Sequence, residues 1–243
     1  MNQIAARIAS WPRPEIANGT IEALKWLALV LMIGDHINKY LLNDTVAWLY
    51  DAGRMAMPLF MFVLAYNLAR PGALESGAYR RSMIRLAVFG ALASPAFLAL
   101  GGLVNGWWPL NILFTLFVLT AALRLLEMGR LQGYLAAGLV FALGGSLVEF
   151  WWPALAFGVA IWSYTKQPSM PALILAFASC AALGFINGNQ WALASILILL
   201  IAPFVALPCP RLRWFFYAFY PAHLTLIWLA RIPLRQAGYL FFT

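Results

Sequence analysis

Long apolar stretches separated by short polar ones dominate the hydropathy pattern of the chain. A helix needs about 20 apolar residues to cross a bilayer, whereas the strands of a membrane barrel show short segments of alternating character. The pattern therefore predicts helices and not a barrel. We expect nine membrane spans, at 24–42, 48–69, 84–104, 108–126, 131–147, 151–165, 170–187, 191–207 and 214–232.

The turns between these stretches are brief, as in a compact helix bundle. The chain shows no internal repeat beyond the Trp-Trp-Pro triplets at 107–109 and 151–153. We therefore predict one all-α, polytopic transmembrane domain over residues 1–243, in which residues 1–20 form a cytoplasmic segment. Those first residues contain no apolar core of the kind found in signal peptides, so no cleavable signal is expected.

Composition supports a membrane protein and excludes several other classes. Of 243 residues, 64% are apolar and 10% are charged, whereas soluble domains average about 45–50% apolar and roughly 25% charged residues. A soluble enzyme, a disordered chain and a secreted disulfide scaffold are therefore excluded. The two cysteines, Cys180 and Cys209, match no metal-ligand spacing, so no metal site is expected.

The formal net charge of +8 comes from basic residues in short clusters between the apolar stretches. This arrangement is typical of the positive-inside rule and not of a nucleic-acid groove, so no nucleic-acid partner is expected. With the N-terminus in the cytoplasm, 12 of the 16 Lys and Arg residues fall on the cytoplasmic side. These are Arg7, Arg13, Lys25, Arg70, Arg80, Arg81, Arg85, Arg124, Arg130, Lys166, Arg211 and Arg213. Because Arg231 and Arg235 depart from the rule, an eight-span arrangement with the C-terminus inside is the alternative.

The ionisable residues expected within the bilayer are the candidates for chemistry, because a charge in hydrocarbon costs about 3 kcal/mol or more. They are Asp35, His36, Arg54, Glu149 and His223, and the two histidines are the only ones in the chain. With a rise of about 1.5 Å per residue, His36 lies roughly 16 Å and His223 roughly 15 Å from the cytoplasmic surface. Two imidazoles at one level could act as a base with an orienting partner, or as a base and an acid. The alternative is that each only hydrogen-bonds across helices and stabilises packing.

The polar neighbours of the histidines allow several interpretations. Asp35 points about 100° away from His36 on the same helix, and we expect it to pair with Lys39, four residues later. Arg54 either binds a carboxylate or phosphate with its planar guanidinium or reaches to the membrane interface.

Two further polar residues lie near predicted helix ends. Asn111 either caps the helix that follows it or donates into a site, and capping is the simpler interpretation. Glu149 is expected near the outer face as a solvated loop carboxylate. No phosphate-binding glycine loop, zinc motif or serine-nucleophile motif is present, so any chemistry must come from the histidines and their neighbours.

Four blocks of the sequence resemble TraX-type conjugal-pilus proteins, and together they extend from residue 24 to about 230 in the family order. The first ends in Gly34-Asp35-His36-Ile37, and the last contains Phe219-Tyr220-Pro221-Ala222-His223. The other two blocks are residues 53–60 and 111–116. Length and basic balance also resemble those of the related TrbP proteins.

The resemblance implies a role in maturing a conjugative pilin in the bacterial inner membrane, where TraX is associated with acetylation of the pilin amino terminus. The family is also similar to integral-membrane acyltransferases in which a basic residue, ten residues and a catalytic histidine follow one another. Lys25 and His36 have that spacing. The resemblance thus implies that His36 is the base and Lys25 a contact of the acyl donor. His223 and Arg54 match family motifs, whereas the block around Glu149 departs from the family pattern.

We therefore predict an acyl-transfer enzyme that acts on pilin, with membrane lipid as its surroundings. His223, Tyr220 or Arg54 would stabilise the oxyanion. Acetyl-coenzyme A is the expected donor for acetylation. Head-to-tail cyclization of the pilin, which needs no cofactor, is the alternative reaction. A non-catalytic pilin-binding assembly factor is the alternative from another class, and a secondary transporter is disfavoured because repeats are missing.

Overall fold

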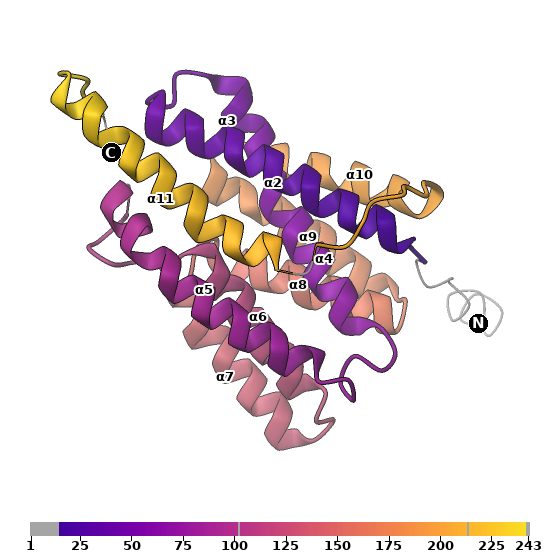
Figure 1. The fold of residues 1–243 in the computed structure, drawn as a ribbon. Helices are drawn as coiled ribbons and strands as arrows, with labels where there is room; N and C mark the ends of the chain where they lie inside the picture. Colours follow the sequence, from indigo (N-terminus) through magenta and orange to yellow (C-terminus); the bar gives the residue numbers. More distant parts are fainter. Residues whose placement is uncertain (1–14, 102, 213, 242–243) are drawn as a thin grey trace.

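The computed structural model describes residues 15–101, 103–212 and 214–241, and all regular secondary structure in these ranges is helical (Figure 1). The prediction of an all-α bundle is confirmed. Part of the predicted segment 1–20, together with Arg7, Arg13 and Arg213, lies outside these ranges. The helices are α2 (Asn18–Leu41), α3 (Ala47–Gly53), α4 (Ala56–Ala69), α5 (Ala78–Leu100), α6 (Ile112–Leu126), α7 (Leu131–Leu147), α8 (Trp151–Lys166), α9 (Met170–Asn187), the 3-10 turn η1 (Trp191–Leu193), α10 (Ala194–Ile201), the 3-10 turn η2 (Ala202–Phe204) and α11 (Phe215–Gln236).

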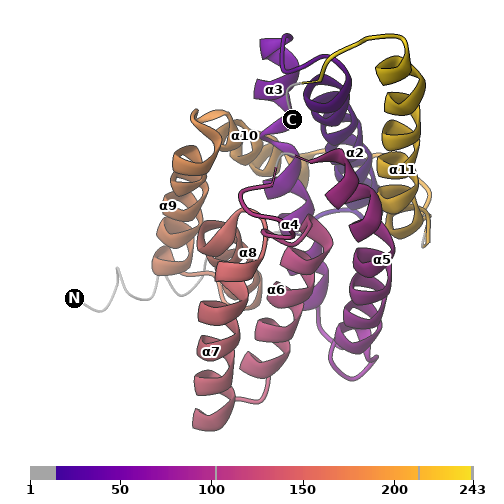
Figure 2. The same ribbon diagram turned by 90° about the vertical axis from the view of Figure 1, so that its left-hand side faces the viewer.

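Helix α4 forms the centre of the bundle. It packs against α2 on one side and α8 on the other, and most of its side chains are buried. A helix that is apolar on all sides is stable when protein or lipid covers its faces, and neighbouring helices cover most of α4. The remaining helices surround it, with α6 and α7 paired on one side and α9 and α10 on another (Figure 2).

Helix α11 brings the end of the chain back to its beginning. It packs along α5 and also contacts α2, and Figure 1 shows it running between these two helices. The last and first apolar helices of the described chain therefore lie side by side. Side chains separated by nearly the whole sequence can meet there.

Two predicted spans are interrupted. The stretch 48–69 is divided at Arg54 and Met55 into α3 and α4, and 191–207 is divided into η1, α10 and η2 before the backbone becomes extended at Val205. Short α- and 3-10 segments in series allow the chain to change direction where a continuous helix would not.

Other predicted ends are displaced by local backbone chemistry. The stretch 84–104 ends at Leu100, because Gly101 adopts a positive φ of 79° that terminates the helix. The stretch 108–126 becomes helical only at Ile112, after Pro109 and the capping residue Asn111. By contrast, α7, α8 and α9 match their predicted ranges within one residue.

Three described segments are long and apolar enough to cross a membrane by length and composition: Ala47–Ala69, Ala78–Leu100 and Met170–Asn187. Ile112–Leu126, Leu131–Leu147 and Trp191–Phe204 are apolar but shorter. The expectation of nine spans is therefore not confirmed. Helix α2 is long enough but carries Lys25, Asp35 and Lys39, which lower its hydropathy.

Candidate active site

The two histidines meet where α2 and α11 lie side by side. Nδ1 of His36 is 2.7 Å from Nε2 of His223, although 187 positions separate the residues. The rings are nearly parallel, with an interplanar angle of 5° and centroids 5.0 Å apart. His223 is buried, whereas His36 is half-buried. The predicted juxtaposition of the two imidazoles is confirmed.

The contacts of His223 determine where the protons of the pair lie. Its Nδ1 is 3.1 Å from the carbonyl oxygen of Phe219, one turn earlier in α11. A carbonyl oxygen only accepts, so this Nδ1 carries the proton and donates it. Nε2 of neutral His223 is then an acceptor, and the proton of the short contact belongs to Nδ1 of His36. Consequently Nε2 of His36 has a free lone pair.

Aromatic rings enclose the histidine pair. The ring centroids of Tyr40 and Tyr220 lie 5.6 and 6.4 Å from that of His36, and Tyr220 is 5.3 Å from His223. Phe219 stacks on His223 with centroids 5.1 Å apart. Both tyrosines are buried. Sequence reasoning missed Tyr40, although its position four residues after His36 places it on the same helix face.

Beside the pair, the Asp35 carboxylate forms an ion pair with the Arg54 guanidinium. The predicted pairing of Asp35 with Lys39 is wrong, because Lys39 instead lies 5.1 Å above the ring of Tyr40. Arg54 also donates from Nε to the carbonyl oxygen of Tyr50 (3.1 Å). Arg54 is thus engaged by a carboxylate of the protein itself, which leaves it poorly placed to stabilise an oxyanion.

The beginning of α6 approaches the site from the other side. Asn111 caps this helix, since its Oδ1 accepts from the N–H of Leu113 (3.1 Å). Its Nδ2 donates to the carbonyl oxygen of Gly90 in α5 (3.0 Å). Both ends of the amide are occupied, so the capping interpretation is confirmed and Asn111 does not point into the site.

Glu149 lies in the turn between α7 and α8 and is half-buried rather than a freely solvated loop carboxylate. Its carboxylate accepts a hydrogen bond from the N–H of Ile112, and burial raises its pKa to about 7. The charges of Asp35 and Arg54 act on it, which places it near their ion pair. The expectation of a solvated carboxylate at this position is wrong.

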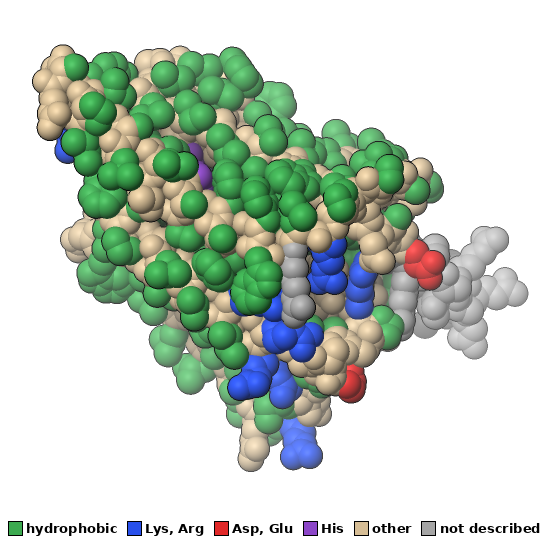
Figure 3. Space-filling model, in the orientation of Figure 1, with side chains coloured by type: hydrophobic (Ala, Val, Ile, Leu, Met, Phe, Trp, Pro, Cys, Tyr) green, Lys and Arg blue, Asp and Glu red, His purple; other side chains and the backbone are tan. Residues whose placement is uncertain are grey.

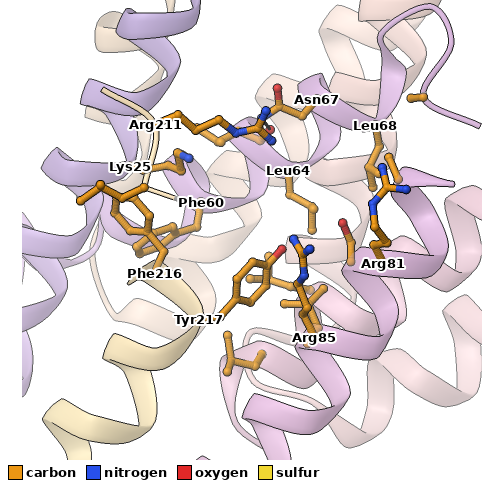
Figure 4. A pocket seen from close by; sticks show the side chains of 18 of the residues that line it. Lys25, Phe60, Leu64, Asn67, Leu68, Arg81, Arg85, Arg211, Phe216 and Tyr217 are labelled. Carbon is orange, nitrogen blue, oxygen red and sulfur yellow. Dashed lines mark hydrogen bonds between the residues drawn. The ribbon is translucent and has the colours of Figure 1, made fainter. Parts of the chain in front are cut away.

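A cavity of about 900 Å³ opens between α2, α4, α5 and α11 (Figure 4). Lys25, which forms an ion pair with Glu22, lines one side of it. Tyr220 also lines this cavity and contacts the histidine pair, whereas the histidines themselves do not line it. The cavity therefore ends one helical turn before His223.

The outer surface offers a second approach to the pair. Figure 3 shows a face that is mostly hydrophobic, with Lys and Arg gathered toward its lower part and a small patch of histidine exposed among apolar side chains. The half-buried residue of the pair is His36. The site is thus accessible from the apolar face as well as lying close to the basic cavity.

Comparison with known proteins decides the family. The model for the TraX protein matches residues 20–231, which include His36, Arg54 and His223. The chain belongs to the TraX family. Two relatives named Protein TraX, from Escherichia coli and from its strain K12, are each 33% identical over 148 residues, or 60% of this chain and 56% of the relative. The chain thus matches about half the length of these TraX relatives.

A further relative extends the similarity beyond that region. The "Probable fimbrial assembly protein FimC, serogroup H1" of Dichelobacter nodosus is 25% identical over 241 residues, which cover 87% of this chain and 96% of that protein. No solved structure matches the chain.

Proposed function

We propose that this TraX-family chain is a bacterial inner-membrane enzyme that transfers an acyl group to the N-terminal α-amine of a conjugative pilin, with acetyl as the expected group. The contact between His36 and His223 carries the proposal, because the hydrogen bond at Nδ1 of His36 orients the ring and leaves the lone pair on its Nε2 available. Membership in the TraX family and the similarity to a protein named as a probable fimbrial assembly protein support pilin as the substrate.

In this proposal Nε2 of His36 is the general base. The amine nitrogen attacks the carbonyl carbon of the acyl donor while its proton passes to Nε2 of His36. The imidazolium that results still donates from Nδ1 to Nε2 of His223, and that hydrogen bond strengthens as positive charge develops. When the tetrahedral intermediate collapses, the leaving group departs with the proton. An α-amine has a pKa of about 7.7–8.0, so a neutral imidazole suffices.

Tyr220 is the group best placed to stabilise the oxyanion. Its ring contacts His223, and the residue is buried and also lines the basic cavity. A phenol that donates to a developing oxyanion in a site without bulk water contributes more than it would in solution. Arg54 is already paired with Asp35 and serves to fix α2 against the start of α4.

The apolar approach to His36 suits a substrate that is itself a hydrophobic membrane protein. A pilin that diffuses within the bilayer would present its terminus to the exposed histidine patch between α2 and α11 (Figure 3). In this proposal the basic end of the bundle and the N-terminus face the cytoplasm. The shorter apolar helices would complete a polytopic bundle of eight or nine spans.

Intact-mass spectrometry of pilin produced together with wild-type or His36→Ala protein tests the proposal. Ile37→Ala is the matched control, since it changes the neighbouring residue, which lies outside the pair. We expect a mass gain of one acetyl group with wild type and Ile37→Ala and none with His36→Ala. If His36→Ala protein, present in the membrane at normal amounts, leaves the pilin mass unchanged from wild type, the enzymatic proposal is overturned and an assembly factor is favoured. A product lighter by one water than the trimmed linear pilin would instead show cyclization.

A further inference from the structure

The cavity beside the candidate active site has an unusual distribution of charge. Its described lining contains five basic side chains and no carboxylate. The basic residues are Lys25, Arg70, Arg81, Arg85 and Arg211. Figure 4 shows Lys25, Arg81, Arg85 and Arg211 around the cavity, on α2, on α5 and on the segment before α11. A concave site with one sign of charge concentrates its field on a ligand of the opposite sign.

Neutral groups hold three of these guanidinium groups in place. Arg81 donates to the carbonyl oxygen of Ser76, and Arg85 lies 4.3 Å above the ring of Trp214. Arg70 donates to the side-chain oxygen of Asn18 (2.7 Å). Within the described ranges, none of the three forms an ion pair with a carboxylate. Their positions are thus fixed while their charges stay uncompensated.

Arg81 and Arg85 bring two like charges into the same cavity. They are four residues apart in α5, on the same helix face, where like charges repel. An anion bound between them would remove that repulsion. A guanidinium binds phosphate with two parallel hydrogen bonds, so phosphate is the anion that suits this pair best.

Apolar side chains line the cavity between its basic residues. Leu29, Met32, Phe60 and Leu64 are among these apolar residues, and Tyr220, which contacts His223, also lines the cavity. A ligand with phosphate groups at the arginines and an extended, less polar arm would therefore place the end of the arm near Tyr220. The ring centroid of Tyr220 lies 6.4 Å from that of His36, so an acyl group held there would lie close to the proposed base.

We infer that this basic cavity binds the phosphate groups of the acyl donor, with Arg81 and Arg85 as their principal contacts. The inference rests on the proposed function and adds the chemical class and place of the donor. Two sources share this chemistry: a soluble nucleotide-linked acyl thioester of the coenzyme A class, and a phospholipid. With the thioester, the bond from the amine nitrogen to the acyl carbon forms, the carbon–sulfur bond breaks, and the thiol leaves with the proton. With the lipid, the ester carbon–oxygen bond breaks and the hydroxyl of the lysolipid keeps the proton.

Binding of coenzyme A to the full chain in nanodiscs of zwitterionic lipid tests the inference. Arg81→Ala/Arg85→Ala is compared with Arg80→Ala, which removes the same type of charge at an exposed position outside the cavity. Each substitution to alanine in the cavity removes charge-assisted hydrogen bonds to phosphate. We therefore expect the Kd for coenzyme A to rise about tenfold or more in the double variant and by less than about twofold in Arg80→Ala. If the double alanine variant does not fold, Arg81→Lys/Arg85→Lys replaces it. Its Kd is expected to be about threefold higher than that of wild type, because lysine lacks the planar guanidinium that binds phosphate with two hydrogen bonds.

The outcomes separate the two donor sources from failure. If coenzyme A does not bind, native mass spectrometry measures whether each protein retains a bound phospholipid. A phospholipid retained by wild type and Arg80→Ala but lost from the double variant would identify the lipid as the acyl donor. Binding of neither, or equal loss in Arg80→Ala and the double variant, overturns the inference. His36→Ala is expected to bind coenzyme A as wild type does, so failure of the proposed chemistry is seen in the pilin mass and failure of the cavity is seen in binding.

Discussion

Asp35 and Arg54 join α2 to the break between α3 and α4 through a largely buried ion pair, with side chains 15% and 12% exposed. Arg54 is held on its other side by Tyr50, whose ring lies 4.1 Å from the guanidinium carbon. The pair sits next to His36 in sequence, so it determines how the last two turns of α2 meet the rest of the bundle. Its loss would move His36 as well as destabilise the fold.

Removing only one charge of this pair is expected to be costly. Arg54→Ala leaves the Asp35 carboxylate buried without its partner, which destabilises a protein by about 3–5 kcal/mol. Removing both charges, in Asp35→Asn/Arg54→Gln, is expected to cost clearly less, because no unpaired charge remains. Thermal unfolding in detergent measures both. A double variant less stable than either single variant would contradict this interpretation of the pair.

Gly53 allows the close approach on which this ion pair depends. A Cβ atom at Gly53 would lie 2.5 Å from Cβ of Asp35, which no side chain tolerates without movement. Gly53→Ala is therefore expected to destabilise the fold by about 1–3 kcal/mol. Gly138→Ala in α7 is the control, since nothing lies within 4 Å of the added atom. That change should be neutral or stabilise by about 0.5–1 kcal/mol, and equal losses in both variants would show that the contact with Asp35 does not matter.

The proton positions in the histidine pair predict different effects for two substitutions of His223. His223→Ala removes the acceptor of the His36 proton and should lower pilin modification about a hundredfold. His223→Gln can place its amide oxygen near the position of Nε2 and accept the same proton, so more activity should remain than in the alanine variant. Single-turnover modification of purified pilin compares them. Equal activity in the two variants would argue against an accepting role for His223.

Glu149 predicts a dependence of stability on pH. Its pKa is about 7 in the folded protein, against an ordinary value of 4.5, so the folded state holds the proton more tightly than the unfolded state. Stability is then lost as the pH rises from 4.5 to 7 and stays lower above that range. Glu149→Gln removes the ionisation, so its melting temperature should exceed that of wild type by on the order of 5 °C at about pH 8. The two proteins should melt alike near pH 4.5, and a constant difference across the range would contradict the assignment.

Much of the fold could be predicted because helices that face lipid or the protein core are recognisable in the sequence as apolar stretches. The ranges of α7, α8 and α9 follow from hydropathy and from the turns that separate them. The break within 191–207 could not be predicted, since the hydropathy of that stretch stays high across it. The break at Arg54 has a signal in the sequence, because Asp51, Gly53 and Arg54 interrupt the apolar stretch 48–69.

The contact between the two histidines could be predicted from their depth below the cytoplasmic membrane surface. His36 and His223 are expected at one level because each follows a basic residue by a similar number of positions. The packing of α11 beside α2 then brings the two rings into contact. The partner of Asp35 was not predictable, because Lys39 is near in sequence whereas Arg54 becomes near only when α3 folds back on α2. The same holds for Glu149, which reaches the first turn of α6 through the turn between α7 and α8.

The separation of the two histidines by 187 positions has a consequence for biogenesis. A nascent chain emerging from the ribosome carries His36 in its first described helix long before the helix with His223 exists. The imidazole pair is assembled only after α11 has been synthesised and has packed beside α2. A chain that stops before α11 would thus lack the pair, and under the proposed function it would not modify other amines in the membrane.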